Sequence, residues 1–276
     1  MKIFFLQILT SCFVVSLSFG QIIRSPLSNH YTGAVTYSNN FADAFSFSGN
    51  QAALGNLKDA EAGLYGEKRF GLKALSNYHG VIGIPLRNAG VGLNMYHSGG
   101  NDFNETQAGL GYGMPLSGNI TIGAQLNFNQ IRISGYGSAS TVNFELGALF
   151  ALSNKVRMGL HVYNPVGGKF GKNKAEKFAS IYKAGVGYEA SEQFFVSAEI
   201  AKEENLPVNV NAAMQYNFNK HFLARGGVSS AIANYFLGVG ILWNAMRLDF
   251  ISSYHQQLGF SPSLMMVFNF SETATK

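Results

Sequence analysis

The chain has 276 residues, including 32 glycines, 23 phenylalanines and 13 tyrosines, and its formal net charge is +5. Charged residues make up 13%, roughly half of the ~25% typical of soluble domains, whereas the hydrophobic share of 47% is ordinary. This composition excludes a disordered chain, and a single cysteine excludes a disulfide scaffold. The mean hydropathy of +0.07 is too low for a bundle of membrane helices. What remains is an all-β protein rich in aromatic residues and glycine.

Residues 1–20 have the order of a secretory signal peptide. Lys2 precedes a short apolar run, and small residues lead to Gly20, after which we expect cleavage. Cleavage would remove Lys2 and Cys12 and lower the net charge from +5 to +4. The tetrapeptide 9–12 also fits a lipoprotein cleavage box, but the apolar run continues past Cys12. An ordinary signal peptide is therefore the favoured interpretation, and lipidation of Cys12 stays open.

Residues 21–58 do not alternate cleanly and carry little charge. They are rich in alanine, phenylalanine and asparagine, above all between Tyr37 and Gly55. Such a segment either folds into the interior of the following domain as a plug or extends from that domain into the periplasm. The sequence leaves both arrangements open.

From residue 59 onward the chain alternates with period two, which is typical of strands with one apolar and one polar face. Residues 119–129 carry apolar side chains on one face, at Ile120, Ile122, Ala124, Leu126 and Phe128. The other face holds asparagine, threonine, glycine and glutamine, and residues 208–219 repeat the pattern. Turn signals divide the chain into about fourteen strands. Their lengths suit the ~9–11 residues that a tilted strand needs to cross a bilayer. We predict them at residues 59–70, 74–86, 89–98, 104–116, 119–134, 140–152, 155–164, 177–190, 193–203, 207–219, 221–230, 233–244, 246–256 and 261–270.

The connections fall into two classes if both termini are placed in the periplasm. The predicted periplasmic turns are tight, as at Arg87-Asn88 and Asn244-Ala245, whereas outer loops such as 99–103 and 165–176 are mostly longer. This asymmetry is typical of outer-membrane barrels. A soluble sandwich or solenoid would also alternate, but its exterior would need many more charges. We therefore predict a transmembrane antiparallel outer-membrane β-barrel of about 14 strands over residues 59–270, with a periplasmic tail at 271–276.

The polar face of the strands should line the lumen, and it carries charges of both signs. Buried charges are costly unless they are paired or wet, so we expect a hydrogen-bonded network rather than a selective ion path. Lumen glycines such as Gly109, Gly123 and Gly185 would let a plug approach closely, or would merely relieve crowding where strands bend. The charged residues expected in this network are Glu61, Glu145, Arg157, Lys183, Glu189, Glu199, Arg225, Arg247 and Asp249.

No motif for catalysis, metal or cofactor binding stands out. Gly109, Gly111 and Gly113 repeat at period two within a strand, unlike a dinucleotide-binding loop, and the six histidines lack ligand spacing. No nucleophile motif flanks His161 or His255, so we predict that the protein is not an enzyme. The basic residues do not form a nucleic-acid platform with aromatics, and the lysine run at 169–177 favours a solvated loop.

The segment before the first strand resembles the N-terminal hatch of the FadL family of long-chain fatty acid transporters. The family's Asn-Pro-Ala-x-Leu motif corresponds to Asn50, Gln51, Ala52, Ala53 and Leu54, with Gln51 in the place of proline. The chain also resembles the related PorV and PorQ proteins of type IX secretion. The resemblance implies a fourteen-stranded barrel with the N-terminal segment inside, and for a transporter a hydrophobic ligand released through a lateral opening.

Short predicted outer loops leave little room for ligand capture. We therefore expect an accessory subunit of an outer-membrane secretion or assembly complex, in the outer membrane of a Gram-negative bacterium, with a protein partner and surrounding lipid. The alternative is passive uptake of a hydrophobic, fatty-acid-like ligand. That alternative predicts an apolar pocket beside the hatch and a gap between strands.

Overall fold

The computed structural model describes residues 29–167, 169–170, 176–177, 179–204, 206–230 and 234–270. The predicted signal peptide, Cys12 and the tail at 271–276 lie outside the described residues. The helical elements are α1 (Asn29–Thr32), α2 (Ser46–Gly49), η1 (Gln51–Asn56), η2 (Arg69–Gly71) and η3 (Lys73–Leu75). The strands are β1 (Glu61–Lys68), β2 (Ser76–Leu86), β3 (Ala89–Gly99), β4 (Phe103–Ser117), β5 (Ile120–Ile133), β6 (Gly137–Ala151), β7 (Val156–Tyr163), β8 (Lys169–Phe170), β9 (Glu176–Lys177), β10 (Ile181–Glu189), β11 (Phe194–Glu203), β12 (Asn209–Asn217), β13 (Phe222–Ser229), β14 (Asn234–Trp243), β15 (Met246–His255) and β16 (Gly259–Asn269).

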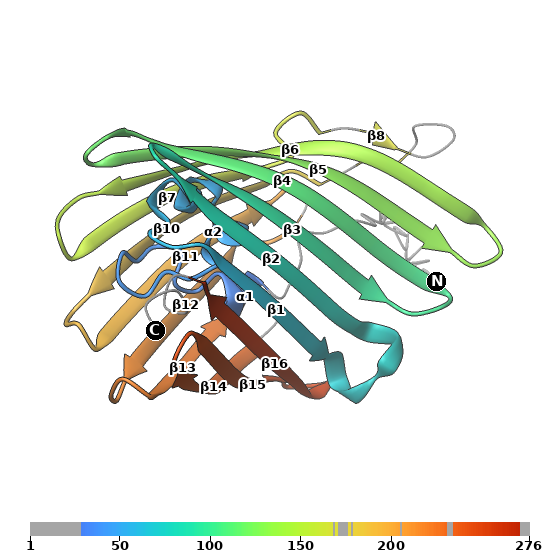
Figure 1. Ribbon diagram of the computed structural model, residues 1–276. Helices are drawn as coiled ribbons and strands as arrows, with labels where there is room; N and C mark the ends of the chain where they lie inside the picture. The colour runs from blue at the N-terminus through green and yellow to red at the C-terminus, as the bar shows by residue number, and fades with distance from the viewer. Residues whose placement is uncertain are drawn as a thin grey trace, which may run out of the picture.

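Fourteen strands form one closed antiparallel barrel, which confirms the predicted fold class (Figure 1). Each strand pairs with its neighbours along the chain, and β7 pairs with β10 across the small β8–β9 hairpin. The barrel closes between β1 and β16, in a register that runs from Glu61 opposite Asn269 to Glu67 opposite Ser263. Closure leaves no strand edge in the wall, as a membrane barrel requires.

The pleat of the strands sends polar side chains inward and apolar ones outward. In β5, Gln125, Asn127 and Asn129 are buried, whereas Leu126 and Phe128 are 59% and 50% exposed. A soluble sandwich would show the reverse, because its apolar faces would pack against each other. The outer wall is thus suited to lipid. Among the described residues, no helix is long and apolar enough to cross a membrane.

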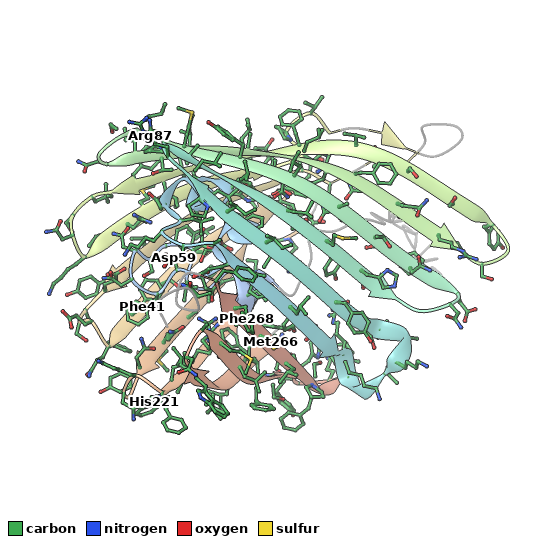
Figure 2. The ribbon with its side chains drawn as sticks, in the orientation of Figure 1. Phe41, Asp59, Arg87, His221, Met266 and Phe268 are labelled. Carbon is green, nitrogen blue, oxygen red and sulfur yellow. The ribbon has the colours of Figure 1, made fainter. Side chains whose placement is uncertain are left out.

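The tight turns gather at one end of the barrel, where β1 begins and β16 ends. Figure 2 shows Arg87 and His221 at this end, in the short β2–β3 and β12–β13 turns. We take this end as periplasmic and the opposite one as extracellular, since outer-membrane barrels place their short turns in the periplasm.

Several strand boundaries differ from the prediction by two to four residues. The first strand ends at Lys68 rather than at residue 70, because Phe70 and Gly71 both have positive φ (52° and 71°), a conformation that ends a strand. The η2–η3 turn then delays β2 until Ser76. Likewise, β10 begins at Ile181 rather than at residue 177, since Glu176–Lys177 pairs with Lys169–Phe170 in the outer loop.

Residues 29–57, called here the plug segment, lie inside the barrel near its periplasmic end (Figure 1). Their side chains form the main hydrophobic cluster of the molecule together with inward side chains of the wall. Phe45 and Leu54 are fully buried there. Of the two arrangements that the sequence left open, the described part of this segment adopts the one inside the lumen.

Candidate functional site

The plug segment meets the wall where the lumen carries glycine. Leu54 sits in a socket formed by Gly90, Gly92, Gly111 and Gly113, referred to below as the Leu54 socket. A Cβ added at Gly90 would lie 2.0 Å from the Leu54 carbonyl oxygen, and one at Gly92 would lie 2.7 Å from Leu54 Cδ2. No side chain fits at these positions while Leu54 occupies the socket.

Other lumen glycines allow equally close approach. A Cβ at Gly123 would lie 2.3 Å from the Gln51 carbonyl carbon, and one at Gly147 would lie 2.1 Å from Asn50 Oδ1. On the opposite wall, Gly185 and Gly187 make room for Tyr37. Of the two roles considered for lumen glycines, close contact with the plug segment is the one that these distances support.

Asn50 and Gln51 connect the plug segment to β6 and β7. Asn50 caps η1, since its Oδ1 accepts a hydrogen bond from the Ala52 amide at 3.1 Å. Its Nδ2 donates to the carbonyl oxygens of Ala148 at 3.2 Å and Leu160 at 2.9 Å. Gln51 Nε2 donates to Glu145 Oε2 at 2.6 Å. The side chain that replaces the family's proline therefore holds a buried carboxylate.

Glu145 is the centre of a polar group on the lumen face of β5, β6 and β7. Besides Gln51, its carboxylate accepts from Asn127 Nδ2 at 2.6 Å, and His161 Nε2 lies 2.9 Å from its Oε2. Gln125 Nε2 donates to the same carboxylate at 3.3 Å. Four polar partners compensate for taking this charge out of water.

A second group joins the plug segment to β7 and β10. Glu189 accepts hydrogen bonds from the Ser38 hydroxyl at 2.6 Å and from the amides of Asn39 and Asn40 at 2.6 Å and 3.1 Å. Asn40 Nδ2 adds a fourth at 2.5 Å. Arg157 donates to the Ser38 carbonyl oxygen at 3.1 Å and also to Asn39 Oδ1. A loop of three residues is thus held by one acidic and one basic side chain of the wall.

A third group is a chain of buried charges. Arg247 Nη2 of β15 donates to Asp43 Oδ2 of the plug segment at 2.5 Å, and its Nε donates to Asp249 Oδ2 at 3.1 Å. Arg225 Nη2 of β13 lies 3.2 Å from the same Asp249 oxygen. All four side chains are at least largely buried, so each charge depends on its neighbours for compensation.

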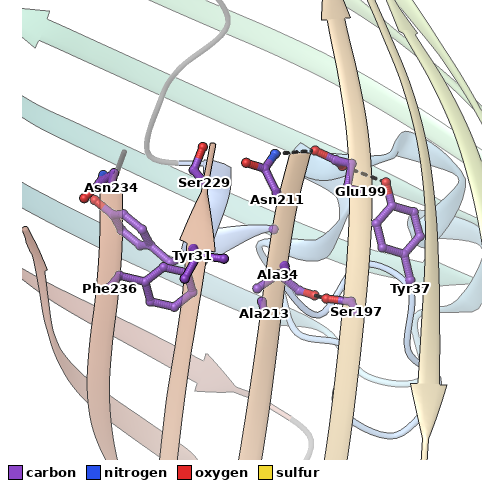
Figure 3. A pocket seen from close by; sticks show the side chains of 13 residues that line it. Tyr31, Ala34, Tyr37, Ser197, Glu199, Asn211, Ala213, Ser229, Asn234 and Phe236 are labelled. Carbon is purple, nitrogen blue, oxygen red and sulfur yellow. Dashed lines mark hydrogen bonds between the residues drawn. The ribbon is translucent and has the colours of Figure 1, made fainter. Parts of the chain in front are cut away.

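The fourth group lies beside a small cavity between the plug segment and strands β11–β14 (Figure 3). Tyr37 donates to Glu199 Oε2 at 2.7 Å, Asn211 donates to Oε1 at 3.1 Å, and Lys183 Nζ lies 3.9 Å away. Burial, followed by the nearby Glu199 carboxylate, raises the pKa of the Tyr37 phenol well above its usual value. The cavity measures about 30 Å³, room for about one water molecule.

The structure therefore distributes the predicted lumen charges over separate groups rather than one network. Glu61 lies at the periplasmic rim close to the third group, since it interacts electrostatically with Asp43 and Arg247, and Asn269 Nδ2 donates to its Oε1 at 3.4 Å. The polar groups also include three side chains that the sequence did not predict for the network: Asp43, Tyr37 and His161. Only His161 could have been found, because it shares the inward phase of β7; the plug segment has no such periodicity.

Metal chemistry finds no support in these groups. Within the described ranges, no set of three His, Cys, Asp or Glu side chains is arranged to hold a metal ion. The polar groups instead bond to the plug segment and to one another, which is an arrangement that positions a segment inside the barrel.

The fold and its internal segment define a plugged, fourteen-stranded membrane barrel. No protein-family model matches the chain, and the curated proteins include no significant sequence match. Among solved structures, the chain is similar to the P. putida toluene transporter TodX, with a TM-score of 0.64, 11% identity, and coverage of 83% of this chain and 95% of that one. It is also similar to a Pseudomonas aeruginosa FadL homologue, with a TM-score of 0.57, 10% identity and coverage of 86% and 95%. The particular fold is thus that of FadL-type barrels.

Proposed function

We propose that the protein is an outer-membrane channel for passive uptake of hydrophobic small molecules. The observation that carries this proposal is the likeness of the closed barrel to a toluene transporter, over 95% of that transporter's chain. A segment packed in the lumen fits such a channel, because it blocks free diffusion of water-soluble solutes.

Transport through this barrel requires the plug segment to move. The cavity beside Tyr37 holds about one water, too little for an aromatic hydrocarbon or an acyl chain. The wall is hydrogen-bonded between all neighbouring strands, including β1 and β16. The proposal therefore includes displacement of some part of the plug segment when a ligand passes.

Uptake by living cells tests the proposal. Radiolabelled toluene and a labelled long-chain fatty acid are offered to a Gram-negative host that makes the protein, and uptake is compared with the host that lacks it. We expect faster uptake that persists when a protonophore collapses the energy supply, and no faster entry of a labelled sugar. Equal uptake of both hydrophobic compounds with and without the protein would refute the proposal.

A second candidate is an accessory subunit of an outer-membrane secretion or assembly complex. The observation in its favour is the same unbroken wall around a packed lumen, which offers a rigid body with an apolar exterior. This candidate predicts a stoichiometric protein partner after extraction in mild detergent, detected by mass spectrometry. Migration alone with a bound fatty acid would instead support the uptake channel.

A further inference from the structure

The outer wall carries two adjoining hollows near the extracellular ends of β1–β4. The lower hollow, called here the wall groove, has a volume of about 540 Å³ and is bordered by apolar side chains from several strands. The groove is lined by three large apolar side chains, Leu64 of β1, Met95 of β3 and Met266 of β16. Gly66 and Gly80 also line it. Figure 2 shows Met266 on the wall formed by β16.

The upper hollow, called here the rim pocket, has a volume of about 710 Å³ and is more polar than the wall groove. It is lined by Lys73 of η3, Arg132 at the end of β5, Asn104 of β4, and Asp102 just before that strand. Tyr78 and His97 line both hollows, so the two are continuous.

The apolar side chains that border the wall groove belong to the outside of the barrel, and the buried Tyr65, His79 and Tyr96 also line it. Leu64, Tyr78 and Met95 are 61%, 56% and 56% exposed, and they alternate with buried lumen residues along their strands. The wall groove therefore lies in the lipid-facing belt, and the rim pocket lies where that belt meets the extracellular surface. An occupant must be apolar below and polar above.

The charge of the rim pocket favours an anion. Lys73 and Arg132 contribute two positive charges against the one negative charge of Asp102. Lys68 and Arg69 follow at the end of β1, on the same rim. Basic residues at a membrane surface attract anionic headgroups, and guanidinium and ammonium groups both bind phosphate oxygens. His97 Nδ1 lies 2.9 Å from Thr106 Oγ1, which orients the ring and leaves Nε2 as its other polar atom.

The glycines of the wall groove are not required by packing within the protein. A Cβ at Gly66 would lie 3.6 Å from Tyr78 Cδ1, and one at Gly80 would lie 3.5 Å from Leu64 Cδ2. Both are ordinary contacts, in contrast to those of the Leu54 socket, where a Cβ would collide with the plug segment. A larger side chain would fit at Gly66 or Gly80 and would fill the groove, so the glycines keep a depression open on the lipid face.

We propose that this face binds one membrane lipid with an anionic phosphate headgroup. An acyl chain lies in the wall groove along Gly66 and Gly80, and the phosphate sits in the rim pocket between Lys73 and Arg132. The site is independent of the lumen, so it holds whether the barrel is a channel or a subunit of a complex.

The test measures lipid binding to the full protein in detergent by native mass spectrometry. The probes are dioctanoyl phosphatidic acid, dioctanoyl phosphatidylcholine and inorganic phosphate. The charge variant combines Lys73→Gln with Arg132→Gln, and the groove variant is Gly80→Leu. Matched controls are Lys155→Gln with Lys220→Gln at the periplasmic end, and Ala124→Leu on the lipid face of β5. Heat-modifiable mobility in gels shows that each variant is a folded barrel.

We expect phosphatidic acid to bind in a one-to-one complex and more tightly than phosphatidylcholine. The charge variant should weaken binding about twenty-five-fold, at about fivefold for each cation. The groove variant should weaken it about tenfold, because the introduced leucine side chain would displace the methylenes of one acyl chain. The controls should bind as the unmodified protein does.

Three outcomes would overturn the proposal. The first is equal affinity for the two lipids, and the second is inorganic phosphate binding as tightly as phosphatidic acid, which would make the pocket a site for the free anion. The third is a protein that co-purifies through this face, is lost with Gly80→Leu, and excludes phosphatidic acid.

Discussion

Leu54 should be the side chain on which retention of the plug segment depends most. It is fully buried, and its socket is lined by glycines that have no side chains to move into a vacated space. Truncation by Leu54→Ala therefore leaves a cavity that the wall cannot close, and such truncations cost about 2.7–5 kcal/mol. A cost of about 4 kcal/mol, relative to the released segment, would raise the population with the segment undocked about a thousandfold.

Thiol labelling measures this population directly. Ala53→Cys places a thiol at a position that is 6% exposed, and its labelling by a maleimide follows the undocked fraction when redocking is fast. We expect labelling about a thousandfold faster when Leu54→Ala is added. Leu126→Ala, on the lipid face of β5, is the matched control and should leave the rate unchanged. Equal labelling rates in the two double variants would show that the Leu54 socket does not retain the plug segment.

Three further predictions concern the same interface. Gly123→Val should push the backbone of the plug segment out of place and raise ion conductance in planar bilayers, whereas Ala124→Val, which faces lipid, should not. Asp43→Ala should cost about 3 kcal/mol, because it takes one partner from a buried arginine that still keeps Asp249, and chemical denaturation in detergent would measure the loss. Glu145→Ala should destabilise the folded barrel by about 3 kcal/mol in the same assay, since it leaves several buried donors unpaired. A loss below about 1 kcal/mol in either the Asp43 or the Glu145 variant would contradict the assigned contacts.

Much of the wall could be predicted because period-two alternation is a local property of the chain. Asn127 and Phe128 differ in polarity, and that difference alone assigns them to lumen and lipid. The end of the first strand was harder to predict, since Phe70 adopts a left-handed conformation that bulky residues rarely enter. Its amide donates to Ser261 Oγ at 3.0 Å, a contact with a strand almost two hundred residues later.

The sequence by itself determined that the chain forms strands with a polar inner and an apolar outer face, because each strand carries that information in its own residues. It also indicated which charges face the lumen. Only the tertiary structure decided their partners, since Asp43 and Arg247 lie 204 residues apart in the chain and meet only when the barrel closes around the plug segment. The position of that segment depends on glycines spread over many strands, and their joint surface exists only after every strand has found its register.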